Sequence, residues 1–181
     1  MSLRHAILGF LATSPMTGYD LRKHMEVSVA HFWPADQAQI YRTLAKLVQD
    51  GLVEVHVIPQ HDKPNRHEHH ILPAGIAELD RWLASSTEYE PTREPFLLQV
   101  FFGGRLGPEH VGRLLAQRRH DAEQLLAALR AVERGASEAP ERQHLSLEQR
   151  LRLATLANGI AHAEAELKWI DEVGETLGAY Q

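Results

Sequence analysis

The chain has 181 residues, a length that suits one medium domain or two small ones, and 44% of them are hydrophobic, enough for a sizeable core. It has no cysteine, which excludes disulfides and thiolate chemistry, and no apolar run of the roughly 18 residues that a membrane helix needs. Its net charge of −5 disfavours bulk attraction to nucleic acid, so any nucleic-acid site must be a local patch. We expect a cytoplasmic protein without membrane contact.

The first half of the chain has the pattern of three helices followed by a hairpin and a fourth helix. Helices are predicted where apolar residues recur at helical spacing, and strands where they alternate with polar ones. In chain order the elements are a helix at 3–13, helices at 18–29 and 37–50, a strand at 52–58, a loop at 59–66, a strand at 67–72 and a helix at 74–85. Thr17 with Asp20 and Asp36 with Gln39 form capping pairs at two helix starts, and Gly51 stands where the third helix ends. This order is typical of a winged helix-turn-helix.

The second half has no strand pattern and is predicted to be helical. A short apolar helix is expected at 94–102, a long helix at 108–134, a polar linker at 135–145 and a second long helix at 146–177, opened by the capping pair Ser146 and Gln149. Both long helices carry apolar residues at heptad-like spacing, broken only by Arg118. These predicted seams are Val111, Leu115, Ala122, Leu125, Leu129 and Val132 on the first helix, and Leu153, Leu156, Ile160, Ala163, Leu167 and Ile170 on the second. Such surfaces need a partner, and the simplest partner is a second copy of the chain.

The expected fold class is therefore mainly α with a small β-hairpin wing. A winged helix-turn-helix DNA-binding domain is predicted over 1–85, followed by an α-helical dimerisation domain over 86–181.

The predicted helix at 37–50 has a polar and cationic side that suits DNA. In a helix-turn-helix this element enters the major groove, where Gln and Arg side chains hydrogen-bond base edges. Phosphate contacts, in contrast, fix the register of the protein on DNA. The residues predicted to meet base edges are Gln37, Gln39 and Arg42. Those predicted to meet phosphates are Thr17, Tyr19 and Lys46, and those predicted on the wing are Lys63, Arg66 and His67.

Several short motifs in this first half closely resemble the PadR family of transcriptional regulators. They are Ile7-Leu8-Gly9, Pro15-Met16-Thr17-Gly18-Tyr19-Asp20-Leu21, Phe32-Trp33, Gln39-Ile40-Tyr41, Thr43-Leu44 and Leu47, and Gly51-Leu52-Val53. The wing matches loosely, with His69 and His70 near the family's aromatic positions and Pro73 in place of a Thr. The second half shares no specific motif with the family and resembles only in its general helical pattern the virulence-activator-like dimerisation domain of longer members.

The resemblance implies a non-enzymatic homodimeric regulator that binds a palindromic operator in double-stranded DNA. It also implies repression that a small-molecule effector relieves, and it places Tyr19, Gln39 and Tyr41 near the DNA backbone. For an effector, the aromatic residues Trp33, Phe102 and Trp169 are candidates, at the junction of the two predicted domains.

The sequence patterns that would indicate a metal site, a nucleotide site or a hydrolase are weaker. The histidine-rich stretch 61–70 matches no strong zinc spacing and is interpreted as a polar wing, so no metal or cofactor is expected. The glycine-rich stretch 103–108 lacks the ending of a P-loop, and no nucleophile elbow is present. The alternative is a winged-helix protein-interaction module without DNA binding. The operator, the regulated genes, the effector and the choice between repression and activation stay open.

Overall fold

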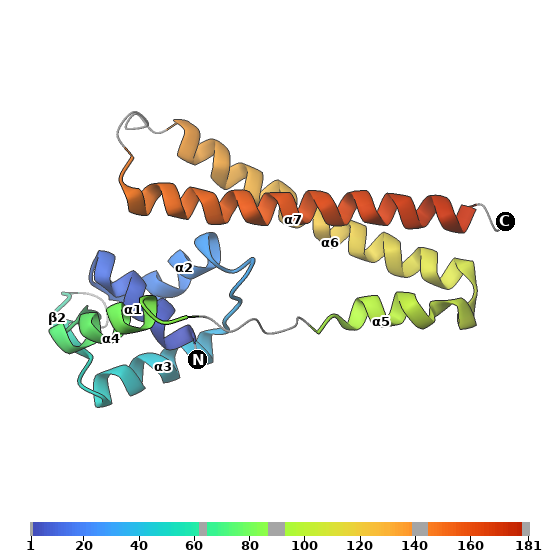
Figure 1. Ribbon diagram of the computed structural model, residues 1–181. Helices are drawn as coiled ribbons and strands as arrows, with labels where there is room; N and C mark the ends of the chain where they lie inside the picture. The colour runs from blue at the N-terminus through green and yellow to red at the C-terminus, as the bar shows by residue number, and fades with distance from the viewer. Residues whose placement is uncertain (1, 62–64, 87–92, 139–144, 179–181) are drawn as a thin grey trace. The chain divides into compact units, whose positions relative to one another are not determined.

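The computed structural model describes residues 2–61, 65–86, 93–138 and 145–178, and the chain divides into two compact units, Met1–Tyr89 and Glu90–Gln181. Both units are dominated by helices, and the first also contains a small antiparallel sheet (Figure 1). The fold class is therefore the predicted one, mainly α with a β-hairpin.

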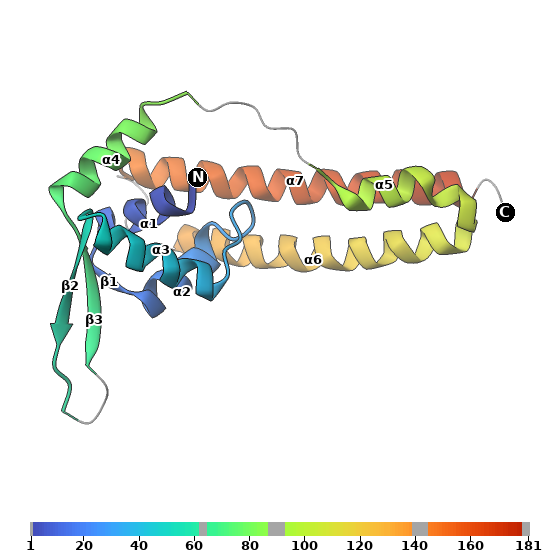
Figure 2. The same ribbon diagram turned by 90° about the horizontal axis from the view of Figure 1, so that it is seen from below.

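The first unit has the predicted order of helices and hairpin. Its elements are α1 (Ser2–Thr13), β1 (Met16–Thr17), α2 (Gly18–Ser28), α3 (Gln37–Gln49), β2 (Val53–Ile58), β3 (Arg66–Ile71) and α4 (Pro73–Leu83). Strands β2 and β3 lie side by side as a hairpin (Figure 2), and β1 pairs with the other edge of β3, which gives the order β1-β3-β2. The sequence did not predict β1, because two residues are too short for an alternating pattern.

The core of the first unit joins α1, α2, α3 and the start of β2. Its largest side chains are at most 2% exposed; they are Ile7, Leu8, Leu11, Leu21, Ile40, Leu44, Leu47 and Val53. Full burial of one such side chain stabilises a fold by about 1.5–3 kcal/mol. This core fixes the orientation of α3 on the unit.

The capping pairs differ in how completely they form. Ser146 and Gln149 exchange both bonds of a capping box, at 2.8 and 3.1 Å. At the start of α2, Thr17 Oγ1 accepts from the Asp20 N–H at 3.1 Å, but the Asp20 carboxylate accepts from the Thr17 hydroxyl instead of the Thr17 backbone. An Asp side chain is one methylene shorter than the Glu or Gln of a full box, so only half of the predicted box is present here.

The second unit consists of two long helices and a short apolar one. Its elements are α5 (Pro95–Phe102), the 3-10 helix η1 (Gly103–Leu106), α6 (Pro108–Glu138) and α7 (Leu147–Gly178). Helices α6 and α7 pack side by side in opposite directions (Figure 2), and α6 extends beyond its predicted end at residue 134. In the described part of the chain, no helix is long and apolar enough to cross a membrane.

The predicted seams of the long helices supply most of their buried residues. Val111, Leu115 and Ile170 form one cluster near α5, and Leu129, Leu156 and Ile160 form another toward the other end. Leu125 departs from the prediction, since 39% of its surface is exposed. Arg118, the polar seam residue, bonds Glu166 at 2.6 Å and lies over the ring of Phe96.

Apolar side chains on α5 and η1 remain exposed within the single chain. Their exposed fractions run from 49% to 79%, and we call this set the α5 patch: Leu97, Leu98, Phe101, Phe102 and Leu106. Large apolar side chains exposed together on neighbouring short helices are typical of a surface that another molecule covers.

Candidate nucleic-acid interface

Helix α3 begins and ends at well-defined signals. Asp36 Oδ1 accepts from the Gln39 N–H at 2.7 Å, and Gln39 Oε1 accepts from the Asp36 N–H at 3.3 Å, which completes the predicted capping box. Gly51 takes a φ of 68°, in the left-handed region that glycine adopts at helix ends. The N-terminal turn of α3, where helix-turn-helix proteins meet base edges, is therefore held in place by its own residues.

The residues of α3 form four rows along the helix: one buried row, an exposed row opposite it, and one row on each side between them. Ile40, Leu44 and Leu47 are buried. The opposite row, which we call the central strip, is exposed along its whole length and consists of Ala38, Arg42, Ala45 and Gln49. The strip is offset by two residues from the buried row, or about 200° at 3.6 residues per turn, so it points away from the core.

One flank of the strip faces α1 and carries Gln39, Thr43 and Lys46. The Thr43 hydroxyl donates to the Gln39 carbonyl at 2.7 Å, and the Gln39 side-chain oxygen is used by the capping box. The Thr43 hydroxyl and the Gln39 side-chain oxygen therefore each have a hydrogen-bond partner at or within α3. Lys46 is exposed and has no ion-pair partner among the described residues, so its charge is available.

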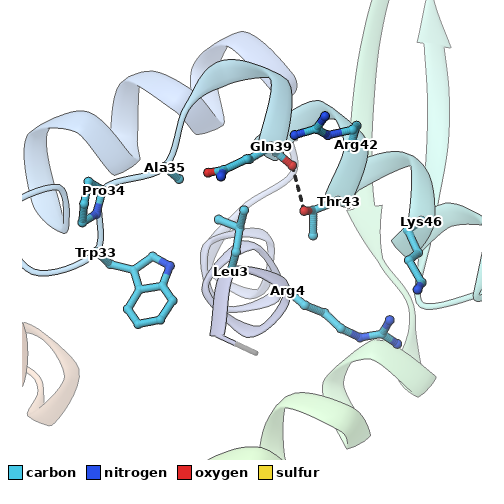
Figure 3. A pocket seen from close by; sticks show the side chains of 9 residues that line it. All are labelled: Leu3, Arg4, Trp33, Pro34, Ala35, Gln39, Arg42, Thr43 and Lys46. Atoms are coloured by element: carbon cyan, nitrogen blue, oxygen red, sulfur yellow. Dashed lines mark hydrogen bonds between the residues drawn. The ribbon is translucent and has the colours of Figure 1, made fainter. Parts of the chain in front are cut away.

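Beside this flank lies an open hollow, which Figure 3 shows at close range. It is lined by Leu3, Arg4, Trp33, Pro34, Ala35, Gln39, Arg42, Thr43 and Lys46. Thr43 points toward Leu3, whereas Arg42 lies at the rim, on the side of α3 opposite Leu3 (Figure 3). Arg4 is paired with Asp50, so Arg42 and Lys46 are the cations of this hollow without a described carboxylate partner.

The other flank faces α2 and carries Gln37 and Tyr41. The Tyr41 ring lies over Gly18, where a Cβ would stand 2.6 Å from Tyr41 Cε1. Tyr41 is nevertheless 43% exposed, so part of its side chain reaches solvent. The first turn of α2 thus fixes this tyrosine next to the central strip.

Tyr19 lies on the first turn of α2 and is 54% exposed. Arg22 and Lys23 both stand 5.7 Å from its ring centroid, within cation–π range. Arg22 also pairs with Glu26 at 2.8 Å. These two cations next to Tyr19 were not predicted, and the (i, i+3) and (i, i+4) spacing from Tyr19 was the available signal.

Two of the remaining residues predicted to contact DNA already interact with carboxylates of the protein. The Thr17 hydroxyl is held by Asp20. Arg66 lies on β3 and stands 3.3 Å from Asp20 and 3.3 Å from Glu68, so two carboxylates share its charge. Lys63 lies outside the described residues. Arg42 and Lys46 are thus the best presented of the predicted cations.

The histidines of the hairpin interact with neighbouring carboxylates and with each other. His56 and His70 stack with their ring centroids 4.0 Å apart, and each ring has a glutamate within 3.0 Å. Burial is the largest cause that lowers the pKa of His69, and the charges of His67 and His70 lower it further. A backbone hydrogen bond with Met16 acts in the opposite direction and raises this pKa. Across the described ranges, no three side chains are placed to hold a metal ion.

The three aromatic residues considered for an effector do not form one described cluster. Trp33 borders the hollow beside α3 in the first unit. In the second unit, Trp169 packs edge-to-face on Phe96 at 6.1 Å, while Phe102 packs on Phe101 at 4.9 Å and stays 62% exposed. Trp169 is therefore a packing residue of its own unit.

Two family models match the chain, and together they span most of it. The model described as Transcriptional regulator PadR-like family matches residues 7–81, and the model described as Virulence activator alpha C-term matches residues 92–178.

Relatives with similar sequences are named as regulators. The chain is 31% identical to a probable transcriptional regulator, Rv1176c of Mycobacterium tuberculosis, over 98% of each chain. It is also similar to a negative transcriptional regulator, PadR of Bacillus subtilis, at 30% identity over 55% of this chain and 56% of the relative.

Solved structures share the fold over the full length. The virulence activator AphA of Vibrio cholerae superposes with a TM-score of 0.78 at 29% identity, covering 99% of this chain and 100% of that one. Bacillus subtilis PadR has been solved with operator DNA (TM-score 0.81, 22% identity, 98% and 99% covered) and with p-coumaric acid (TM-score 0.76, 20% identity, 97% and 95% covered). At these identities the Bacillus structures show the shared fold. From its two domain matches and its full-length relative, the chain belongs to the PadR-like family of transcriptional regulators.

Proposed function

We propose that the chain is a homodimeric repressor that binds a palindromic operator with α3 in the major groove. The observation that carries this proposal is the exposed surface of α3, where Arg42 on the central strip and Lys46 on the flank that faces α1 are unpaired in the part of the chain that the structure describes. A protein-binding helix would more often present large apolar side chains, and the central strip has none, which makes the protein-interaction alternative less suitable. We place its action in the cytoplasm, where operator DNA lies.

In this proposal the exposed residues around α3 divide into two roles. Arg42, with Gln37 and Gln39, faces the base edges, while Lys46, Tyr19, Tyr41 and Thr17 face the phosphates and fix the register of the protein. Arg66 and Lys63 of the wing supply further backbone contacts. The surroundings of the Tyr19 ring support the assignment, because Lys23 adds positive charge beside it, whereas the charge of Arg22 is shared with Glu26.

Dimerisation through residues 86–181 is supported by the α5 patch. Side chains as exposed as Phe101, at 79%, are costly to leave in water, and a second copy is the simplest cover. A two-fold dimer would present its two α3 helices to half-sites about 34–36 Å apart or a multiple of that distance.

The proposals of repression and of an effector response are supported by what is known of similar proteins. Bacillus subtilis PadR is called a negative regulator and has been solved with p-coumaric acid, an aromatic carboxylate. For this chain we propose a small-molecule effector that weakens operator binding. Trp33, beside the hollow of the first unit, and the exposed Phe102 of the second unit are alternative candidates for its contacts, and Trp169 is less suitable because it packs on Phe96.

The test is a titration of a fluorescent duplex carrying the DNA upstream of the chain's own gene, at two salt concentrations. We expect saturable binding by a dimer, loss of about 1–3 kcal/mol in Arg42→Ala, and release when p-coumaric acid or a related aromatic acid is added. Arg81→Ala is the matched control, because Arg81 is an exposed arginine of the same unit that pairs with Glu78.

The oligomeric state is tested by light scattering on Phe101→Glu, with Ala77→Glu on exposed α4 as the control. A charge in the α5 patch should give monomers that bind the operator weakly. A folded wild-type protein that is monomeric and binds no genomic fragment would contradict the proposal and favour the protein-interaction module.

A further inference from the structure

The hollow beside α3 is lined entirely by residues of the first unit and is large enough for a small molecule. Its volume is about 730 Å³, within the range of about 300–1,000 Å³ that is usual for small-molecule sites. Three segments form it: the start of α1, the loop that precedes α3, and α3 itself. The hollow is therefore complete within one unit and needs no residue of the second.

One end of the hollow is apolar and carries an aromatic ring. Trp33 lies there, with Pro34 and Ala35 beside it (Figure 3). The backbone N–H of Trp33 donates to the Val29 carbonyl at 2.7 Å, which ties this loop to the end of α2. Leu3 and Ala35 pack against the core of the unit, so the apolar wall is already in place. Because 36% of Trp33 is exposed, a flat ring can stack on its indole.

The other end of the hollow is cationic. Lys46 and Arg4 lie there, away from Trp33 (Figure 3), and no Asp or Glu is among the residues that line the hollow. Arg4 pairs with Asp50, whereas Lys46 has no ion-pair partner among the described residues. The side-chain amide group of Gln39 is a further donor, because the capping box uses only its oxygen. This end thus offers positive charge and hydrogen-bond donors to an anion.

The two ends together select one class of ligand. A neutral aromatic molecule would stack on Trp33 but leave Lys46 unpaired, and an inorganic anion beside Lys46 would leave the indole uncovered. A planar aromatic carboxylate uses both ends, with its ring on the indole and its carboxylate accepting from Lys46 Nζ. The hollow is open to solvent and larger than a single ring, so acids with one ring or two fused rings both fit.

We propose that this hollow is a binding site for planar aromatic carboxylates, and that a bound acid excludes DNA directly because it occupies Lys46 and Gln39. The inference rests on the proposed function, in which Lys46 faces a phosphate and Gln39 faces base edges. The carboxylate of the acid then takes the place of a DNA phosphate on Lys46. Acid and operator are alternative ligands of the same side chains, so the exclusion requires no change in the second unit.

Binding is tested first without DNA, on the full-length protein, through the tryptophan indole N–H signals in nitrogen-15 NMR spectra. The chain has three tryptophans, and the signal that is lost in Trp33→Phe belongs to Trp33. The probes are benzoate, p-coumarate and 2-naphthoate, and at least one should shift the Trp33 signal until it saturates. If none of the three shifts it, or if only the Trp169 signal moves, the inference is overturned.

Two variants separate the contributions of the two ends. Lys46→Gln keeps most of the side-chain length but removes the charge, so it should bind the best acid about tenfold more weakly and its methyl ester as wild type does. Trp33→Leu keeps an apolar side chain without the ring, and it should weaken acid and ester alike, by about fivefold. Lys168→Gln, at an exposed lysine of α7, is the matched control and should bind the acid as wild type does. Equal affinity for the acid in wild type and Lys46→Gln would overturn the inference.

The operator titration distinguishes direct exclusion from coupling through a second conformation. Under direct exclusion the apparent dissociation constant for DNA keeps rising as acid is added, whereas conformational coupling ends in a plateau. We expect no plateau up to about a hundredfold excess of acid over its own dissociation constant, a range that covers typical coupling factors. Sodium acetate, a carboxylate without a ring, keeps the salt concentration constant throughout. A plateau within this range would overturn direct exclusion.

The outcomes also separate this inference from the function on which it rests. Operator binding by a protein whose Trp33 signal none of the acids shifts would overturn the inference and leave the DNA-binding proposal standing. A saturable shift of the Trp33 signal, in a folded protein that selects no duplex from a random library, would support the acid site and contradict the proposed function.

Discussion

Gly18 lies beneath the ring of Tyr41, so close that a Cβ at position 18 would stand 2.6 Å from Tyr41 Cε1 and 3.0 Å from Cζ. Real Cβ contacts are not this short, so the start of α2 and the α2 flank of α3 fit together only with glycine there. Gly18 is buried, while Tyr41 is 43% exposed. The glycine therefore positions a tyrosine that the proposed interface places at the DNA backbone.

Gly18→Ala should displace the Tyr41 ring or move α2 away from α3. We expect a loss of about 1–3 kcal/mol in the free energy of unfolding, as for other overpacked sites, together with weaker operator binding. Denaturant titration and duplex binding measure the two effects. Gly9→Ala in α1 is the control, since nothing lies within 4 Å of a Cβ there and a helical alanine is favoured by up to about 1 kcal/mol. Equal stability and affinity in Gly18→Ala and Gly9→Ala would show that the contact with Tyr41 is unimportant.

Asp36→Ala should remove the side-chain acceptor at the start of α3. Loss of an N-cap costs about 0.5–2 kcal/mol, and the freed turn carries Gln37 and Gln39, so we expect both lower stability and weaker DNA binding. Ser146→Ala provides a comparison, because Ser146 and Gln149 form an equivalent capping box at α7. That variant should lose stability in the second unit while its α3 keeps the wild-type base preference. If base preference changes equally in both variants, the cap of α3 has no special part in recognition.

Most of the fold could be predicted because its signals are local. Capping pairs fixed the starts of α3 and α7, Gly51 fixed the end of α3, and the seam spacing of α6 and α7 predicted the buried clusters at Leu115 and Ile160. Strand β1 could not be predicted, because it exists only through its pairing of Met16 with His69, far away in the sequence.

The site was predicted less completely, for a similar reason. Arg42 and Lys46 follow from their place on an amphipathic helix. The fixed position of Tyr41 depends on Gly18, and the shared charge of Arg66 depends on Asp20, 46 residues earlier. Gln39 was predicted to meet base edges, and the sequence alone did not show that its side-chain oxygen would also accept from the Asp36 N–H in the capping box.

Lys46→Ala should weaken binding to every DNA sequence by a similar factor, because a phosphate contact carries no base information. Each phosphate neutralised contributes about 0.9 to the slope of log affinity against log salt concentration, so the slope should fall by about one for each α3 helix on the DNA. Titrations at several salt concentrations give this slope. Lys168→Ala, at an exposed lysine of α7 that pairs with Glu172, should leave it unchanged. A changed base preference with an unchanged slope would instead assign Lys46 to the base edges.

His69 should make the first unit less stable in mild acid. Burial is the largest cause that lowers its pKa in the folded chain, and its Nδ1 is buried without a hydrogen-bond partner in the described structure. The unfolded chain, in which the pKa has its ordinary value of about 6.5, therefore takes up a proton more readily than the folded chain. Stability from the neutral side chain is present above that pH and is lost as the pH falls below it.

Comparison of wild type with His69→Gln isolates this effect from the other histidines. Between about pH 7 and pH 5, on either side of the ordinary histidine pKa, the free energy of unfolding of wild type should fall more than that of His69→Gln. His24→Gln, at an exposed histidine of α2, should follow the wild-type dependence. Denaturant titrations at each pH supply the values. Parallel pH dependence in wild type and His69→Gln would mean that the folded unit admits the proton on His69 as easily as the unfolded chain does, contrary to its burial against β1.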